Sequence, residues 1–428
     1  MAPVARPWPT AFAAFGLLVC TNGPSIYSAL YWFDGGVSWQ FWTFAYPFGA
    51  VAVIGTLLLW RELKGPALDR IPWQLYAVGA YVGWTLMSAW WSVSPYSTPN
   101  LAITGIGIAA FGCWFGLALG VHEHIWAIVT STAVTSVASA AAIAWQPERG
   151  KMPLLVDDLG GEWRGIFNNR NSLAPVCVLG LIALVGFVGL RPRVSRVVVA
   201  VPLAILHIQL IRGAESETAV VALALVLLAG AVVPALWLLR RWVNGWIVAG
   251  GTLGGLAAGW VVVFANFDRL AEAVGRDPTL SRRRIIWADV REFIQVHPVR
   301  GYGYWAFWDR PDLTAETYAR VGAAYGSAHN SVLEVLLGLG AIGLVIYLAV
   351  VAASVGGICR WVWTQASIAS WWWFVLLVFL VAENLTESFV LWHSYNWVLF
   401  LAAAFVPLGP TARVARPAPD HEGDTHDV

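Results

Sequence analysis

Charged residues are scarce in this chain of 428 residues. Asp, Glu, Lys and Arg together make up 12% of the sequence, whereas an ordinary soluble domain has about 25%. Hydrophobic residues make up 58%, and the mean hydropathy is +0.65. This composition excludes an ordinary soluble domain and indicates a protein embedded in membrane lipids. The formal net charge is only +1, so we expect no nucleic acid among its partners.

The chain also lacks the short motifs of nucleotide and metal chemistry. It has no Walker A loop, no dinucleotide-binding glycine fingerprint, no H-E-x-x-H zinc motif and no G-x-S-x-G elbow. Its four cysteines have no spacing typical of a metal or disulfide framework. The carboxylate pair Asp157–Asp158 is a weak metal signal, and we interpret it as solvated. No short motif here indicates a metal or a cofactor.

Long apolar runs are what the sequence does contain. We count about twelve, each long enough to cross a bilayer core of about 30 Å. A spanning segment must satisfy its own backbone hydrogen bonds, and the alternation of a β-barrel is absent, so we predict an all-α integral membrane protein. The predicted spans are 10–31, 39–60, 72–92, 99–120, 124–145, 172–190, 196–212, 217–239, 243–265, 329–354, 367–390 and 394–410.

The distribution of basic residues predicts the orientation of these spans. The short loops around 33–38 and 93–98 carry no Lys or Arg, which places them outside and both termini in the cytoplasm. The opposite loops are basic, with Arg61, Lys64, Arg70, Arg191, Arg193, Arg196, Arg240, Arg241 and Arg360. We predict one transmembrane domain over residues 1–410, with two longer extracytoplasmic loops, 146–171 and 266–328. Residues 411–428 are predicted to form a disordered cytoplasmic tail.

The larger of these loops combines helical and aromatic character. Apolar residues recur at helical spacing over 268–296, and His297-Pro298 is expected to end that helix. Gly301-Tyr302-Gly303-Tyr304-Trp305 follows as an aromatic turn. Such a turn is typical of a segment that packs on a membrane surface or holds a ligand, and Tyr304 is a candidate for ligand contact.

Arginines make this loop a candidate anion site. Arg282, Arg283 and Arg284 are consecutive, so on a helix only one or two of them can face one ligand. A guanidinium presents a planar fork of donors that suits phosphate oxygens. The alternative is a basic surface on lipid headgroups. Arg212 is a further candidate, although an ion pair with Glu215 or Glu217 would equally explain it.

One histidine lies where the loop meets the next apolar run. His329 begins the sequence His329-Asn330-Ser331. An ionisable group at this place is a candidate functional residue, and histidine can act as a general base near neutral pH. The alternative is a histidine that only caps the helix beginning there.

Three segments resemble the O-antigen ligase and polymerase superfamily of bacterial membrane glycosyltransferases. The first is Ala328-His329-Asn330-Ser331-Val332-Leu333-Glu334 with Leu339-Gly340-Ala341-Ile342-Gly343. The second runs from Arg283 to Trp287 and on to His297-Pro298 and Gly301-Tyr302-Gly303. The third is Gly165-Ile166-Phe167-Asn168-Asn169-Arg170-Asn171. Together they cover roughly residues 160 to 345.

The resemblance implies a fold, a reaction and a set of site residues. It implies a glycosyltransferase-C-like helical fold in the bacterial inner membrane, with the active site on the extracytoplasmic face. The implied reaction moves a glycan from a polyprenyl-diphosphate carrier to the hydroxyl of a glycan or lipid-glycan acceptor, without a metal. His329 would be the base and Arg283 would bind the diphosphate. Further substrate-binding candidates are Arg284, Arg170, Asn171, Asn330 and Tyr304.

The sequence departs from the family pattern at one position. The family often has a basic residue after a serine near the start of the eighth predicted span, but here Glu217 follows Ser216. Either Arg212, five residues before Glu217, supplies that charge, or the donor is handled differently. Glu217 is a second catalytic candidate, as a base or as a group that orients His329.

Other functions remain open on the sequence alone. A polymerase would extend a lipid-linked repeat instead of transferring it to a different molecule, and the motifs do not separate the two. A transporter or flippase of lipid-linked glycan also suits about twelve spans, although its polar residues usually lie at the bilayer midplane in corresponding halves. A non-catalytic envelope assembly factor is a third possibility.

Overall fold

The computed structural model describes residues 7–34, 37–65, 71–153, 161–239, 283–321, 326–388 and 394–414. Over these residues the chain consists of helices and connecting loops, and the one β-bridge joins Lys151 to Trp163. The predicted all-α class is therefore confirmed.

The described residues contain fifteen α-helices. They are α1 (Pro7–Asp34), α2 (Val37–Lys64), α3 (Trp73–Met87), α4 (Ser97–Ala118), α5 (Val121–Trp145), α6 (Pro147–Gly150), α7 (Arg170–Gly189), α8 (Val194–Ala214), α9 (Glu217–Leu239), α12 (Arg283–Val296), α13 (Pro311–Val321), α14 (Ser331–Thr364), α15 (Ile368–Thr386), α16 (Tyr395–Phe405) and α17 (Pro410–Val414). Short 3₁₀ turns are η1 (Ser88–Trp90), η3 (Phe307–Asp309) and η5 (Val406–Leu408).

Eight helices within the described residues are long and apolar enough to cross a membrane. They correspond to eight of the twelve predicted spans, from 99–120 to 217–239 and from 329–354 to 394–410. The runs 10–31, 39–60 and 72–92 lie on α1, α2 and α3. The predicted span 243–265 lies outside the described residues. Residues 411–414, which the sequence assigned to the tail, belong to α17.

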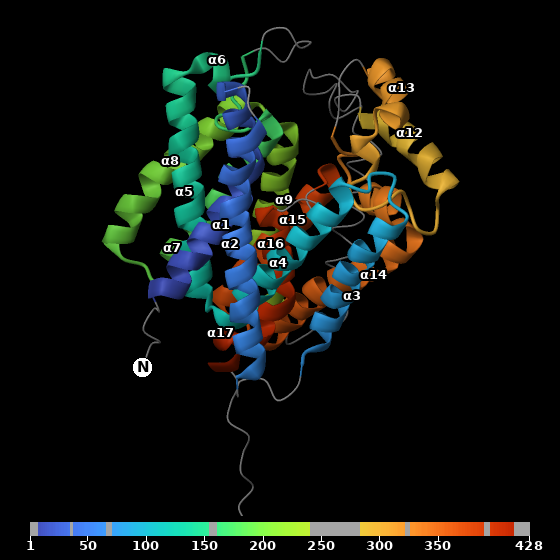
Figure 1. Cartoon of the computed structure of the whole chain (residues 1–428). Coiled ribbons are helices and arrows are strands. Elements are labelled where there is room, and N and C mark those ends of the chain that lie inside the picture. Colours follow the sequence, from blue (N-terminus) through green and yellow to red (C-terminus); the bar gives the residue numbers. More distant parts are fainter. Residues whose placement is uncertain are drawn as a thin grey trace, which may run out of the picture.

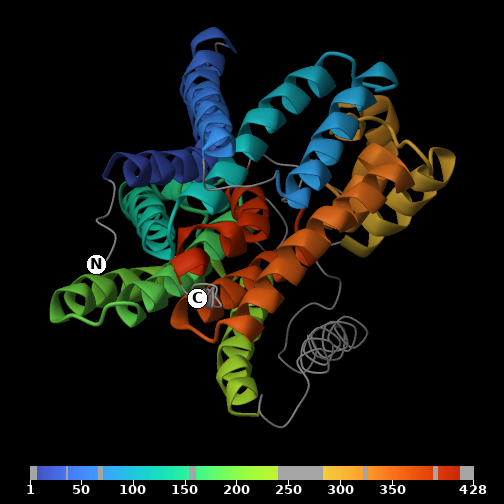
Figure 2. The same cartoon turned by 90° about the horizontal axis from the view of Figure 1, so that it is seen from below.

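The helices differ in how deeply they lie in the bundle. In α15 and in the segment beginning with α16, 78% of the apolar window is buried, whereas only 22% is buried in α8. Figures 1 and 2 show α15 and α16 inside the bundle, and in Figure 2 the green α8 extends outward from it. A helix surrounded by protein can carry polar side chains that lipid would not tolerate. The interior position of α15 is therefore important for the site described below.

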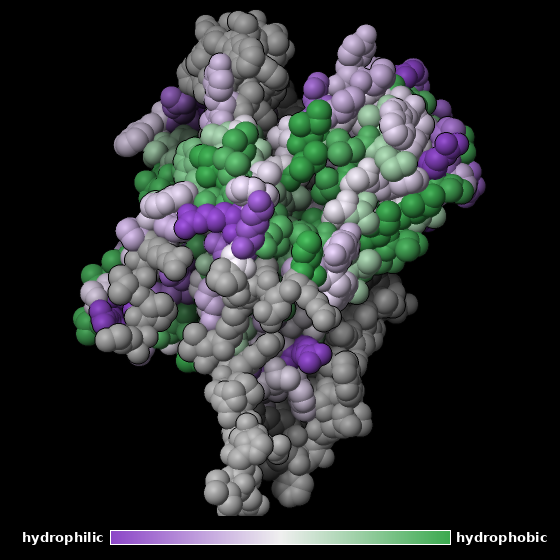
Figure 3. Space-filling model, turned by 60° about the horizontal axis from the view of Figure 1, so that its bottom comes forward, coloured by the Kyte–Doolittle hydropathy of each residue, from purple (hydrophilic) through white to green (hydrophobic). Residues whose placement is uncertain are grey.

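Apolar side chains also cover much of the surface. Val194, Val198 and Ile205 on α8 are more than half exposed, and broad apolar areas are visible on the face shown in Figure 3. Lipid tails solvate such surfaces, so a membrane-spanning bundle has no need to bury them. The exposure pattern agrees with the composition of the chain.

The long helix α14 is broken near its middle. Gly340 has φ 66° and ψ −168°, a conformation open to glycine and strongly unfavourable for other residues. The break frees two backbone N–H groups. Ala341 donates to the carbonyl of Pro298 at 2.8 Å, and Ile342 donates to the carbonyl of Val299 at 3.3 Å. The loop before the aromatic turn therefore supplies the missing acceptors.

The aromatic turn also binds α14 just before the break, where carbonyl groups lack helical N–H partners. The N–H groups of Tyr302 and Gly303 donate to the carbonyls of Leu337 and Gly338, each at 2.9 Å. Gly303 has φ 102°, and a Cβ atom there would meet the backbone of Ser92 at 2.7 Å. The glycines of this turn thus permit close backbone contact. The turn is fixed to α14 at Leu337 and Gly338.

The loop helices gather at one end of the molecule. In Figure 1, α6, α12 and α13 lie at the top and α17 lies at the bottom. Helix α12 ends at Val296, directly before His297-Pro298, as predicted. The residues of α12 that face inward pack against the start of α14, where His329 lies.

Candidate functional site

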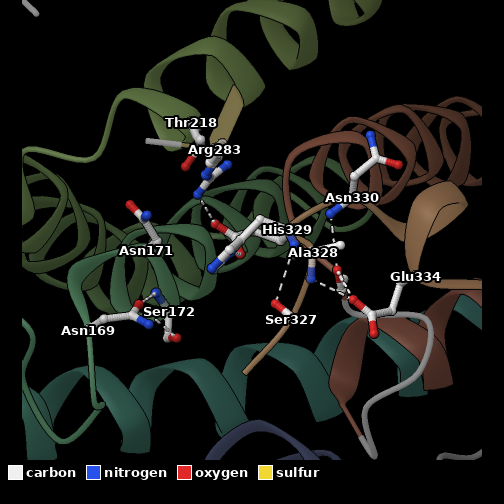
Figure 4. A network of polar contacts seen from close by, with 12 residues as sticks. Asn169, Asn171, Ser172, Thr218, Arg283, Ser327, Ala328, His329, Asn330 and Glu334 are labelled. Carbon is white, nitrogen blue, oxygen red and sulfur yellow. Dashed lines mark hydrogen bonds and ion pairs between the residues drawn. The ribbon is translucent and has the colours of Figure 1, made fainter. Parts of the chain in front are cut away.

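A buried carboxylate joins the predicted histidine to the predicted arginine. Oε2 of Glu387 lies 2.6 Å from Nδ1 of His329, and its Oε1 accepts a hydrogen bond from Nη2 of Arg283 at 2.5 Å. Arg283 and Glu387 are both buried. Figure 4 shows Arg283 and His329 reaching the same point from different segments of the chain. The two residues that the sequence singled out are therefore parts of one cluster.

The charge of Glu387 is stabilised by its two partners. Burial by itself raises the pKa of this carboxyl, but the positive charges of Arg283 and His329 and their hydrogen bonds outweigh it and lower the pKa from 4.5 to about 2. Glu387 is therefore ionised at neutral pH and can only accept hydrogen bonds.

This charge determines how the imidazole ring is protonated. Because Glu387 is acceptor-only, Nδ1 of His329 must carry the hydrogen in their contact. In the neutral ring the lone pair is then on Nε2, where it can receive a proton. The His329 side chain is 18% exposed, so the ring is partly accessible. The arrangement is that of an oriented general base.

Helix α12 brings two residues to this centre. Arg283 and Trp287 are four residues apart and so lie on one face of the helix. Both are buried, whereas Arg284 is exposed. Nε1 of Trp287 donates to the carbonyl of Ala328 at 2.8 Å. Of the candidate pair Arg283 and Arg284, the helix phase thus turns Arg283 inward, while Arg282 lies outside the described residues.

His329 has an unusual backbone conformation. Its φ is +49°, in the left-handed region that residues with a side chain adopt rarely. The preceding residue, Ala328, is held at both backbone groups. Its carbonyl accepts from Trp287, and its N–H donates to Oε2 of Glu334 at 2.6 Å. The surrounding structure therefore fixes the turn that presents the imidazole.

Asn330 is occupied by contacts within the protein. Its Oδ1 accepts from the backbone of Val332 and Leu333 and so caps α14. Its Nδ2 donates to the carbonyl of Leu385 at 3.2 Å, and its backbone N–H donates to Ser388 at 3.0 Å. These contacts hold the start of α14 against the end of α15. Substrate contact by Asn330 stays a prediction.

Arg170 and Asn171 lie against the turn between α8 and α9. Nη1 of Arg170 donates to Glu162 at 3.3 Å and to the carbonyl of Glu215 at 3.1 Å. Oδ1 of Asn171 accepts from the hydroxyl of Ser216 at 2.9 Å. Figure 4 shows Asn171 and Thr218 around the same centre as Arg283 and His329. The segment 165–171, which resembles the family, therefore contacts the position at which the sequence departs from the family pattern.

The ion pair considered for Arg212 does not form. Arg212 is exposed in the last turn of α8, and within the described residues its guanidinium forms no salt bridge with Glu215 or Glu217. Its charge is thus available at the end of the bundle where Arg170 lies. Glu217 begins α9. The carboxylate that orients His329 is Glu387, and a catalytic role of Glu217 stays a prediction.

Tyr304 lies deeper than its place in a loop suggests. Its side chain is buried, its N–H donates to Ser88 at 3.0 Å, and its carbonyl accepts from Thr98 at 2.9 Å. These contacts attach the aromatic turn to η1 and α4. Ligand contact by Tyr304 stays a prediction.

Glu387 is the central residue that sequence reasoning missed. It lies in Val381-Ala382-Glu383-Asn384-Leu385-Thr386-Glu387, within predicted span 367–390. Two carboxylates four residues apart in an apolar run are expensive in a membrane and therefore indicate function. That signal was present. Its partners could not be found from sequence, because Arg283 is 104 residues away.

Within the described part of the chain, no three His, Cys, Asp or Glu side chains gather as ligands of one ion would. Asp157-Asp158 lies outside the described residues. The cluster itself consists of His329, Glu387 and Arg283.

An all-α bundle with eight helices long and apolar enough to cross a membrane, within the described residues, defines a multi-pass membrane protein, and this site lies at one end of it. Residues 202–348 match the family model described as O-antigen ligase, which confirms the predicted resemblance. The matched region contains Arg212, Arg283 and His329 and ends before Glu387. The chain is also 30% identical over 115 residues to the exopolysaccharide production protein ExoQ of Rhizobium meliloti (strain 1021). That match spans 26% of this chain and 26% of the relative, so only about a quarter of the relative's length is compared.

Proposed function

We propose that this protein transfers a glycan from a polyprenyl-diphosphate carrier to an acceptor hydroxyl on the outer face of the bacterial cytoplasmic membrane. The observation that carries the proposal is that Glu387 contacts both His329 and Arg283. This cluster combines an oriented base with a guanidinium, the two groups that such a transfer needs. The match to the O-antigen ligase model supports the same reaction class.

His329 acts on the acceptor. Its Nε2 takes the proton of the acceptor hydroxyl while that oxygen forms a bond to the anomeric carbon of the donor glycan. The bond between the anomeric carbon and the diphosphate oxygen breaks, and its electron pair stays on the diphosphate. Glu387 stabilises the imidazolium that forms, because its negative charge lies 2.6 Å from Nδ1.

Arg283 acts on the leaving group. Negative charge develops on the lipid diphosphate as the bond breaks, and a preorganised guanidinium lowers the energy of that state. One terminal nitrogen of Arg283 binds Glu387, and an arginine has further N–H donors. Arg212 and Arg170, at the same end of the bundle, are candidates for the outer phosphate. The arginines thus supply the charge without a metal.

The acceptor defines the second candidate within this reaction class. The ExoQ relative is described as an exopolysaccharide production protein, which favours an acceptor that is itself a growing polysaccharide. In that case the protein is a polymerase of lipid-linked repeats. The same residues would then perform the same chemistry on a different hydroxyl.

The test compares strains in which the chromosomal gene has been deleted and then complemented. One strain receives the wild type, one His329→Ala and one His297→Ala, at matched protein levels. His297 is an exposed histidine of the same loop and serves as the control. Carrier-linked glycan and mature envelope polysaccharide are quantified by mass spectrometry and gel analysis.

Loss of mature polysaccharide with accumulation of carrier-linked glycan, in His329→Ala alone, supports transfer at this site. Chain length of the wild-type product separates a single transfer from polymerisation. Full rescue by His329→Ala would remove the histidine from the reaction. Carrier-linked glycan confined to the cytoplasmic leaflet would instead favour a flippase.

A further inference from the structure

We infer that Glu334 is a positioning residue that holds His329 in its reactive orientation through the backbone of Ala328. This inference rests on the proposed function of His329 as the base. Glu334 lies in the first turn of α14, five residues after the histidine, and is buried. Its carboxylate accepts hydrogen bonds from Trp308, Ala328 and Ser388 instead of from the imidazole, so its effect on His329 is transmitted by these neighbours.

Three hydrogen-bond donors converge on the Glu334 carboxylate. Oε1 accepts from the indole Nε1 of Trp308 at 2.6 Å. Oε2 accepts from the backbone N–H of Ala328 at 2.6 Å and from the hydroxyl of Ser388 at 3.4 Å. Each oxygen therefore faces at least one donor. A group with two acceptor oxygens fits this environment, and a group with one acceptor and one donor does not.

The contact with Ala328 is the one that reaches the histidine. His329 has φ +49°, and an L-residue keeps this conformation only when its neighbours hold it. Glu334 holds the N–H of Ala328 and Trp287 holds its carbonyl. Without the Glu334 contact the turn loses one of the hydrogen bonds that hold it. Nδ1 of His329 would then leave the position in which it meets Glu387.

The contact with Trp308 links the same carboxylate to the aromatic turn. Trp308 lies in η3, directly after the segment that is fixed to the break of α14. It packs edge-on against Phe307, with ring centroids 5.1 Å apart. Glu334 thus joins the aromatic turn to the peptide that carries the base. This gives the dense aromatic sequence of the loop a role in catalysis without contact to the substrate.

Two substitutions, Glu334→Gln and Trp308→Phe, should partly compensate for each other. Glu334→Gln keeps size and shape but must point its NH₂ group at one of the facing donors. We expect its turnover number to fall at least tenfold, with the KM for the donor within twofold of wild type. Trp308→Phe removes one donor and should lower turnover less. In the double variant the amide can point NH₂ to the vacated side and its oxygen to Ala328, so activity should recover severalfold over Glu334→Gln.

Protein in nanodiscs provides the assay, with lipid-diphosphate glycan as the donor. A second measurement needs no substrate. Diethyl pyrocarbonate modifies the imidazole of His329, and peptide mass spectrometry gives its rate. We expect faster modification in Glu334→Gln than in wild type, and a rate near that of wild type in the double variant.

The two measurements separate the possible failures. Wild-type protein without transfer activity, but with the expected order of modification rates, would overturn the proposed function and keep the positioning role. Wild-type turnover and modification in Glu334→Gln would overturn the positioning role alone. A double variant worse than either single variant in both assays would show that Glu334 and Trp308 only add to folding.

Discussion

The imidazole Nδ1 of His329 and the carboxylate Oε2 of Glu387 lie 2.6 Å apart, although 58 residues separate them in sequence. The other oxygen of the same carboxylate binds Arg283. Glu387 thus positions the candidate base and the candidate diphosphate-binding arginine together. A change at Glu387 should therefore affect both sides of the proposed reaction.

Glu387→Gln should reduce transfer strongly without abolishing the fold. The amide keeps one acceptor oxygen, but it has no charge to stabilise the imidazolium and can point NH₂ at Nδ1. General-base catalysis contributes about 10² to 10⁴ in rate, so we expect turnover to fall by about 10²-fold or more. Initial rates in nanodiscs measure this. Glu387→Asp is the matched charge-preserving variant, and equal loss in both would contradict a specific role of the charge.

The stability of the protein should fall in acid through the same residue. Because the folded-state pKa of Glu387 is lowered from 4.5 to about 2, its contribution is fully present above pH 4.5 and is lost as the pH falls toward 2. The linkage is worth about 1.4 kcal/mol for each unit of pKa difference. Thermal unfolding in detergent, followed by tryptophan fluorescence between pH 2 and 6, measures it. Glu387→Gln should show a shallower pH dependence over this range, and parallel curves would contradict the assignment.

Gly340→Ala should be strongly destabilising. A Cβ atom at this position would lie 2.2 Å from the carbonyl oxygen of Val299, and the backbone has φ +66°. With its ψ of −168°, this backbone conformation is essentially restricted to glycine and costs another residue about 1–3 kcal/mol, and the clash adds to this. Gly356→Ala in the same helix is the control, because a Cβ there meets nothing within 4 Å. The melting temperatures of the two purified variants test this prediction. Similar values would show that stability does not depend on the break in α14.

Much of the fold and part of the site follow from local sequence. Hydrophobic length predicts the spans from 99–120 to 217–239 because each helix satisfies its own backbone and needs no distant partner. The position of His329, between a polar loop and an apolar run, makes it a candidate without knowledge of its neighbours. His297-Pro298 ends α12 for an equally local reason.

The remaining features depend on contacts between distant segments. The residue types do not show whether Arg283 or Arg284 faces inward, and only the phase of α12 buries one and exposes the other. The break at Gly340 requires the carbonyls of Pro298 and Val299, which approach α14 from another segment. Glu387 finds its partners only when α15 packs inside the bundle. Hydropathy and short motifs contain no information on such pairings.

The order of synthesis determines when the Glu387 contact can form. Arg283 and His329 are synthesised first, and their shared carboxylate follows 58 residues after the histidine. A chain that has been inserted only as far as α14 contains the base and the guanidinium but not the group that aligns them. During biogenesis the proposed site can therefore be completed only after α15 has entered the membrane. A chain that ends before α15 therefore lacks the carboxylate that joins the two halves of the proposed site.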